Sequence, residues 1–254
     1  MTLPAAQQEA TRRLRPNHAE RTAGSHAAFF LPHLRPGMRL LDLGCGPGSI
    51  TAGLAAAVAP AETVGLDLDP DPIDGVTVVA GDVMRLPFPD ASFDAIFASA
   101  LLQHLADPLA ALREARRVAR PGAVIGVADP DWDGELLHPK SEMLGRSLEL
   151  ARKLRAGTSP CVGKQLRHLL TEAGFSHAEG YARVMHHGTA EETRGVGAAH
   201  ASLFRFPIQI ERAISHGWAT AQEMEQMNQA WLEWGEEPGA FLARFWCEAI
   251  AFAS

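Results

Sequence analysis

Residues 40–51, "LLDLGCGPGSIT", hold three glycines at alternate positions, Gly44, Gly46 and Gly48, directly after a short apolar run. Glycine permits positive φ angles and lets a ligand approach the backbone closely. A helix that begins directly after such a loop offers unpaired N–H groups to that ligand. The pattern indicates a loop that binds a nucleotide-like cofactor, and the alternative is a tight strand-to-helix turn without a ligand.

Acidic residues accompany the loop at three successive strand ends. Asp42 closes the apolar run before the glycines, Asp67 ends the next apolar run, and Asp82 ends the one after. Ligands of open α/β sheets bind at the carboxyl ends of the strands, where an acid accepts hydrogen bonds from ribose hydroxyls. A carboxylate beside the loop repels phosphates and favours a cationic ligand. S-adenosylmethionine fits, because it carries an ammonium and a sulfonium and no phosphate. Each acid read singly is also compatible with a cap or a turn.

The elements that must position these residues alternate along the chain. Apolar runs predict strands at 39–44, 62–69, 76–83, 93–100 and 123–129, with helices at 25–34, 49–59 and 107–120. Continuous apolar strands alternating with helices are typical of a mostly parallel sheet covered on both faces. We therefore expect an α/β fold, a doubly wound sheet of about seven strands.

The pattern changes after residue 131. We expect helices at 141–156 and 163–175, a strand near 178–187, mostly helical structure at 190–235, and a last strand at 240–252, for which a helix is the alternative. The predicted domains are an N-terminal arm or lid (1–25), a main domain (26–189 and 236–254), and a helical lid inserted before the last strand (190–235). The lid is rich in Phe, Met and Trp, which suits an apolar acceptor.

Composition narrows the function classes. The chain has 254 residues, 46% of them hydrophobic, a net charge of −7 and no long basic run, so a nucleic-acid partner is not expected. Three widely spaced cysteines suggest neither a disulfide framework nor a zinc site. No signal peptide or membrane span is expected, and the predicted location is cytoplasmic. Oligomeric state is left open.

Several stretches resemble the class I S-adenosylmethionine-dependent methyltransferases. They are "LLDLGCGPG", "VGLDLDP" and "GDVMRLPFPDASFDAIFASALLQHLADPLAALREARRVARPGA", and the resemblance covers about residues 20–130. "GKQLRHLLTEAGF" continues it, and the branch that contains the ubiquinone and menaquinone biosynthesis methyltransferases is the most similar. The resemblance implies a Rossmann-like fold, S-adenosylmethionine as cofactor and a small organic molecule as methyl acceptor.

The resemblance also implies roles for individual residues. The methionine part of the cofactor would contact the glycine loop, and its sulfonium would lie near Ala98. The ribose would bind to Asp67, and the adenine would contact Leu68 and Asp82. The full predicted cofactor-binding set is Arg21, Asp42, Gly44, Cys45, Gly46, Gly48, Asp67, Leu68, Asp82, Val83 and Ala98. One departure is the short segment after Asp67, where a turn built by Pro70 and Pro72 replaces the usual helix.

The residues that would bind the methyl acceptor or remove its proton are predicted from their positions after the strands and in the lid. His104 is the candidate general base, because histidine titrates near neutrality, and a structural histidine is the alternative. The candidate acceptor-binding residues are Asp129, Asp131, Trp132, Phe204 and Phe206; for the two acids an ordinary place on a surface loop is the alternative. No metal site is expected at His186-His187, since adjacent strand residues point to opposite faces. Trp231 and Trp234 would share a helix face and pack against a neighbouring helix, and a wall of the substrate site is the alternative.

The sequence therefore predicts a methyltransferase that moves a methyl group from S-adenosylmethionine to a small organic molecule. Two alternatives stay open: a nicotinamide-dependent oxidoreductase on a similar sheet, and a non-catalytic protein that binds S-adenosylmethionine or S-adenosylhomocysteine.

Overall fold

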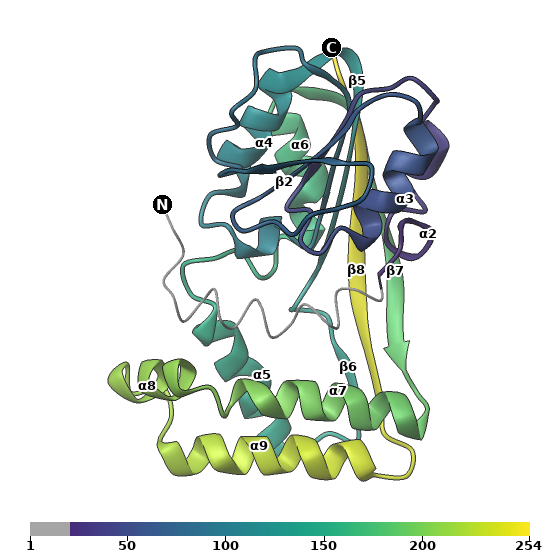
Figure 1. Ribbon diagram of the computed structural model, residues 1–254. Helices are drawn as coiled ribbons and strands as arrows, with labels where there is room; N and C mark the ends of the chain where they lie inside the picture. Colours follow the sequence, from purple (N-terminus) through teal and green to yellow (C-terminus); the bar gives the residue numbers. More distant parts are fainter. Residues whose placement is uncertain (1–20) are drawn as a thin grey trace. The chain divides into compact units, whose positions relative to one another are not determined.

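The computed structural model describes residues 21–254, which form two compact units (Figure 1). The first contains residues up to 130 together with 161–182 and 247–254. The second contains residues 131–160 and 183–246. Residues 1–20 of the predicted arm at 1–25 lie outside the described residues.

Eight strands form one sheet in the order β3-β2-β1-β4-β5-β8-β6, with β7 paired to β8. Their bounds are β1 Leu40–Leu43, β2 Thr63–Asp67, β3 Thr77–Ala80, β4 Phe93–Ser99, β5 Ala119–Pro130, β6 Leu136–His138, β7 Phe175–His187 and β8 Phe241–Ala253. The pairs among β1 to β5 are parallel, and β6 runs antiparallel to β8. The predicted mostly parallel α/β sheet is confirmed. The sequence missed β6, which is only three residues long.

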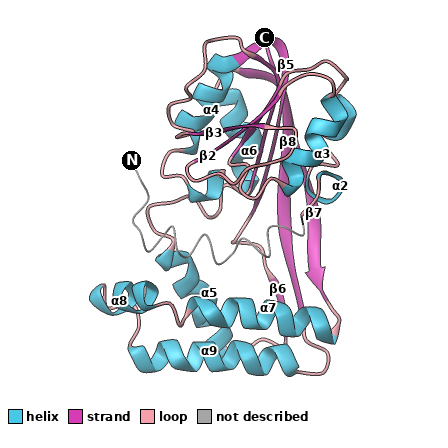
Figure 2. Ribbon diagram, viewed as in Figure 1, coloured by secondary structure: helices cyan, strands magenta, loops and turns pink. Residues whose placement is uncertain are grey.

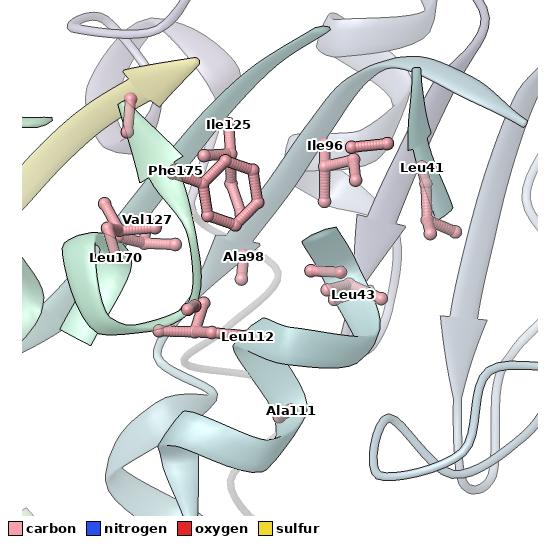
Figure 3. Close-up of a cluster of buried hydrophobic side chains, with 14 of the residues drawn as sticks. Leu41, Leu43, Ile96, Ala98, Ala111, Leu112, Ile125, Val127, Leu170 and Phe175 are labelled. Atoms are coloured by element: carbon pink, nitrogen blue, oxygen red, sulfur yellow. The ribbon is translucent and has the colours of Figure 1, made fainter. Parts of the chain in front are cut away.

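Helices cover both faces of the sheet in the first unit (Figure 2). Successive residues of a strand point to opposite sides, so the apolar strands present buried side chains to the helices on both faces. On one side the cluster containing Leu40 and Phe97 packs against α3 (Ser49–Val58). On the other side the cluster containing Leu41 and Ile96 packs against α4 (Pro108–Val118) and α6 (Leu166–Glu172), as Figure 3 shows. Burial on both faces explains why these strands read as unbroken apolar runs.

The predicted helix at 25–34 is wrong. The chain instead forms a single turn, α2 (Ala23–His26), and a short 3₁₀ helix, η1 (Leu31–His33). The side chains of Thr22 and Ser25 cap α2, and Ala27 leaves the helical region with φ −131°. Pro32 is tolerated in the first turn of η1 but would break a continuous helix, because it has no N–H to donate and its ring would clash with the carbonyl of Ala28.

The second unit is built from helices that carry an apolar face inward. They are α5 (Glu142–Leu154), α7 (Ala190–Leu203), α8 (Pro207–Ser215) and α9 (Ala221–Glu236), so the helical prediction for 190–235 is confirmed. Trp231 and Trp234 are buried, and their indole N–H groups donate to Ser147 Oγ and to the carbonyl of His138 at 2.8 and 3.0 Å. Both tryptophans therefore pack in the core of this unit. None of the helices described is long and apolar enough to cross a membrane.

Candidate functional site

The glycine loop joins β1 to α3 and leaves open space at its centre. Gly46 has φ +52°, and a Cβ built there would meet no atom within 4 Å. Gly48, with φ +82°, is the N-cap of α3, and a Cβ there would lie 2.4 Å from the side chain of Ile73. Close packing therefore requires a glycine at 48, whereas at 46 the open space leaves room for a ligand.

Asp67 ends β2 and turns its carboxylate toward the loop. Its Oδ2 accepts a hydrogen bond from the Gly46 N–H at 3.0 Å, and its Oδ1 accepts from the Asp69 N–H at 3.2 Å. These two bonds fix the carboxylate beside the open space at Gly46. A carboxylate held by backbone donors in this way is ordered before any ligand arrives.

Asp42 lies in β1 beneath the loop and is 3% exposed. Its Oδ2 accepts a hydrogen bond of 2.6 Å from the hydroxyl of Thr51, in the first turn of α3. Burial raises the pKa of Asp42 to about 7, the charge of Asp67 adds to the rise, and the Thr51 hydrogen bond opposes it. Asp42 therefore anchors α3 and places a titratable acid below the glycines.

Cys45 turns its side chain away from the open part of the loop. It is buried, and a Cβ added at Gly65 of β2 would meet its Sγ at 3.0 Å. Burial, together with the charges of Asp42 and Asp67, raises the pKa of its thiol. The side chain is thus an inert packing group, and the backbone N–H of Cys45 donates to the carbonyl of Leu66 at 3.2 Å.

A cavity of about 550 Å³ lies next to β3 and the turn that follows β2. It is lined by Leu68, Asp69, Pro70, Pro72, Ile73, Val76, Val78 and Ala80. No helix separates β2 from β3, as predicted, but the turn falls at Asp74 and Gly75 rather than at Pro70 and Pro72. Leu68 is 46% exposed. An exposed leucine at a strand end offers an apolar face for a flat ring.

Asp82 and Val83 follow β3 in a tight turn. The Oδ1 of Asp82 accepts a hydrogen bond from the Met84 N–H at 2.9 Å, and Val83 is buried beside it. Such side-chain-to-backbone bonds fix the turn conformation. The third predicted acid is thus held by its own turn at the end of β3.

The segment after β4 adopts a strained conformation. Ala98 is buried in the middle of the sheet, and Ala100 has φ +54°, a region that non-glycine residues rarely adopt. The Ala100 N–H donates to the carbonyl of Ala128 at 2.8 Å. The strained turn carries Leu101 to Gly44, where a Cβ would meet it at 3.0 Å. Strain of this kind concentrates at functional sites.

Asp129 supports this segment from below. It is fully buried, and its carboxylate accepts hydrogen bonds from the N–H groups of Leu102 and Gln103 at 3.1 and 3.3 Å. Burial raises the pKa of Asp129 to about 7, while these bonds and the charge of Arg21 oppose the rise. The carboxylate of Asp129 is therefore occupied by backbone donors of the 3₁₀ helix η2 (Leu102–His104). His104, the last residue of η2, is exposed.

The other predicted acceptor residues belong to the second unit. Asp131 is buried, and its Oδ1 accepts from the Asp133 N–H at 3.0 Å. Trp132 is partly exposed. Phe204 is 2% exposed and packs in the core of this unit, whereas Phe206 is partly exposed at the N-cap of α8. Phe204 therefore has little surface left for a ligand.

Sequence reasoning missed the supporting residues Thr51, Ile73, Ala100 and Leu101. Thr51 and Ile73 contact the site through packing between segments far apart in the sequence, which no local pattern signals. Nothing in the type of Ala100 predicts a positive φ, since glycine and asparagine are the residues that favour it. No group of three or more metal-binding side chains occurs among the residues that the structure describes.

The segment that carries this site is similar to known proteins. Residues 41–127, which carry the glycine loop and the acidic strand ends, match the family model described as "Methyltransferase domain". An uncharacterized methyltransferase of Schizosaccharomyces pombe is 26% identical over 239 residues, covering 87% of this chain and 86% of that protein. Residues 41–127 therefore form a methyltransferase domain, and the chain as a whole is similar to the class I S-adenosylmethionine-dependent methyltransferases. Its cofactor is S-adenosylmethionine.

Two further relatives match only part of their own length. An uncharacterized 37.1 kDa protein in a Streptomyces fradiae transposon is 36% identical to the methyltransferase over 153 residues, 56% of this chain and 44% of that protein. The 27-O-demethylrifamycin SV methyltransferase of Amycolatopsis mediterranei is 35% identical over 183 residues, 66% of this chain and 61% of that protein. The chain thus spans less than two thirds of both relatives.

Among solved structures, a phosphoethanolamine N-methyltransferase of Haemonchus contortus in complex with S-adenosyl-L-methionine shares the fold. Its TM-score is 0.52 at 16% identity, and the match covers 86% of this chain and 49% of that chain. At this identity the likeness concerns the fold alone.

Proposed function

We propose that the methyltransferase acts on a small organic acceptor and binds its cofactor along the ends of β1 to β4. The observation that carries this proposal is the open space at Gly46, bordered by the carboxylate of Asp67 and lying above Asp42. A relative whose name describes a rifamycin methyltransferase supports an acceptor of low molecular mass.

In this proposal each part of the cofactor has its own partner. Asp67 accepts hydrogen bonds from the ribose hydroxyls, and Leu68 and Asp82 take the adenine. The methionine part lies on Gly44, Gly46 and Gly48, with Arg21 toward its carboxylate. Asp42 attracts the cationic groups through its charge. Only the backbone of Ala98 is left to lie near the sulfonium, because its side chain is buried in the core.

The bound cofactor supplies an electrophilic methyl group on a positively charged sulfur. The chain has to align the acceptor with that methyl group and exclude water, since alignment and a dry site supply most of the rate enhancement. The strained segment from Ala100 to His104, held by Asp129, gives a rigid wall for this purpose. Where the acceptor arrives protonated, His104 removes the proton.

Calorimetric titration with S-adenosylhomocysteine and with NAD tests the cofactor assignment. We expect S-adenosylhomocysteine to bind and NAD not to bind. Gly46→Val should abolish this binding, because the branched side chain fills the open space. Gly37→Val is the matched control, since Gly37 also has positive φ and nothing within 4 Å. Equal effects of both substitutions would show that Gly46 serves only the turn.

Mass spectrometry of a panel of small alcohols, phenols, amines, thiols and acids incubated with deuteromethyl-labelled cofactor tests the transfer itself. The expected result is a mass gain of one labelled methyl group on at least one class of acceptor. Tight binding of S-adenosylhomocysteine with no labelled product on any class would support a non-catalytic binder instead.

A further inference from the structure

The loop that follows the turn at Asp82 and Val83 forms no helix or strand of its own. It spans residues 84–90 and contains Pro87 and Pro89, which have no N–H to donate. Leu86, in the middle of the loop, is only 4% exposed, so its backbone N–H and carbonyl need partners within the protein. Those partners come from α4, which lies 28 to 31 residues further along the chain.

Glu114 and Arg117 of α4 supply these partners as a pair. They are three residues apart and so share one face of the helix. Arg117 Nε and Nη2 donate to Glu114 Oε1 and Oε2 at 2.9 and 2.8 Å, and Glu114 Oε2 also accepts from the Leu86 N–H at 2.9 Å. The hydrogen bond from Arg117 lowers the pKa of Glu114, against the opposing effect of burial, so the carboxylate is ionised at neutral pH.

Arg117 uses all five of its N–H donors. Besides the two bonds to Glu114, its Nη2 donates to the carbonyl of Leu86 at 3.0 Å. Its Nη1 donates to the carbonyl of Phe88 and to Asp90 Oδ1, both at 2.8 Å. A guanidinium presents its donors in a fixed planar fork, so one side chain holds three positions of the loop at once. Lysine, with three donors on a single nitrogen, cannot reach all of these acceptors.

The loop that this pair holds is continuous with the turn that carries Asp82. The Arg85 N–H donates to the carbonyl of Asp82 at 3.0 Å, and the Met84 N–H donates to its Oδ1 at 2.9 Å. Arg85 directly precedes Leu86, the residue whose N–H and carbonyl are both held by α4. Val83 and Leu86 also pack in one hydrophobic cluster. The position of the Asp82 carboxylate therefore depends on the hold that α4 has on the loop.

We propose that Glu114 and Arg117 are positioning residues for the adenine of the cofactor. They fix the loop after β3, and the loop fixes Asp82 where its carboxylate accepts from the adenine amino group. This inference rests on the proposed function, which assigns the adenine to Leu68 and Asp82. A turn that is fixed in advance strengthens binding, because less conformational entropy is lost when the ligand arrives.

Calorimetric titration with S-adenosylhomocysteine and with its 6-deamino analogue, in which a hydrogen atom replaces the adenine amino group, tests the proposal. The wild type should prefer S-adenosylhomocysteine about tenfold or more, because the analogue leaves Asp82 without that donor. Arg117→Lys keeps the charge but loses the fork. Its affinity for S-adenosylhomocysteine should fall, and its preference over the analogue should shrink about threefold or more.

Arg116→Lys is the matched control, because Arg116 is the neighbouring residue of the same helix and donates to the carbonyls of Gly174 and Ser254, away from the loop. It should keep the wild-type preference. Asp82→Asn should lose most of the preference, and adding Arg117→Lys to it should lower the preference no further, since both substitutions act through one contact.

An Arg117→Lys variant that keeps the full preference would overturn the proposal and leave the proposed function standing, because the pair would then only stabilise the fold. An equal loss of preference in Arg116→Lys would overturn it too. Should Arg117→Lys fail to fold, Glu114→Gln replaces it; the amide loses the charge but keeps an acceptor, and a smaller loss of preference is expected. A wild type that does not bind S-adenosylhomocysteine would overturn the proposed function, and this inference with it.

Discussion

Asp67 is the residue on which the proposed cofactor site depends most. Asp67→Asn keeps an oxygen for the Gly46 N–H but removes the charge that strengthens hydrogen bonds from two ribose hydroxyls. Charge-assisted bonds contribute about 1.5–3 kcal/mol each, so S-adenosylmethionine affinity should fall more than tenfold. Calorimetric titration measures the loss, and Asp74→Asn, on the exposed turn nearby, should bind normally. Unchanged affinity in Asp67→Asn would rule out this placement of the ribose.

We expect Asp42 to make cofactor binding pH-dependent. Its pKa is raised to about 7 in the folded protein, so it becomes ionised as the pH rises from about 6 to 8. A cationic cofactor binds better to the ionised form, and the affinity for S-adenosylmethionine should therefore increase with pH across neutrality. Titrations between about pH 5.5 and 7 stay below the range where the cofactor's own amino group loses most of its protons.

The variant Asp42→Asn should flatten this pH profile, whereas Asp129→Asn should preserve it, because Asp129 is engaged with Leu102 and Gln103. A rise in affinity that survives in Asp42→Asn would assign the titration to another group.

At the scale of one element, Asp129 determines the stability of the segment after β4. Its pKa is raised from 3.8 to about 7, so between these values the unfolded chain has lost a proton that the folded chain retains. The stability that Asp129 contributes is thus complete below about pH 4 and decreases as the pH approaches 7. An amide in its place does not titrate, so the stability difference between the wild type and Asp129→Asn should shrink as the pH rises.

Urea unfolding at pH 5 and at pH 7 measures that difference, which we expect to be about 1–3 kcal/mol at pH 5. The exposed N-cap of α4 provides the comparison: Asp107→Asn keeps a side-chain oxygen for the Ala110 N–H, so we expect it to change the stability little. A difference that grows with pH in Asp129→Asn would contradict the assignment.

At the scale of the whole molecule, the two units should respond to substitution separately. A Cβ at Gly197 of α7 would lie 2.7 Å from the carbonyl of Trp231 in α9 and 3.1 Å from the Cα of Gly235. Gly197→Ala should destabilise the second unit by about 1–3 kcal/mol, because the overlap outweighs the better helix propensity of alanine. S-adenosylhomocysteine affinity should stay unchanged, because the proposed cofactor residues belong to the first unit.

Gly195 in the same helix is the control, since a Cβ there meets no atom within 4 Å. Gly195→Ala should stabilise the protein by about 0.5–1 kcal/mol. Thermal unfolding compares the two variants, and equal destabilisation in both would show that α7 and α9 do not pack as closely as these distances indicate.

The sequence by itself predicted the methyltransferase resemblance, the cofactor and the order of β1 to β5 with α3, α4 and α6 in the first unit. Each of these depends on local patterns: apolar runs, glycines at positions that need positive φ, and acids at strand ends. The geometry of a parallel sheet brings those strand ends to one edge. The helices of the second unit were also predictable, because their caps and apolar periods are local.

Only the tertiary structure decided what the individual acids and arginines do. Asp129 looks like an acceptor-facing residue in the sequence, but it lies buried against the backbone of Leu102 and Gln103. Ala100 shows no sign of its positive φ. Trp132, Arg155 and Arg244 belong to three separate segments, and long-range packing alone brings them together. Contacts between distant segments depend on the whole chain's packing, which no local pattern in the sequence encodes.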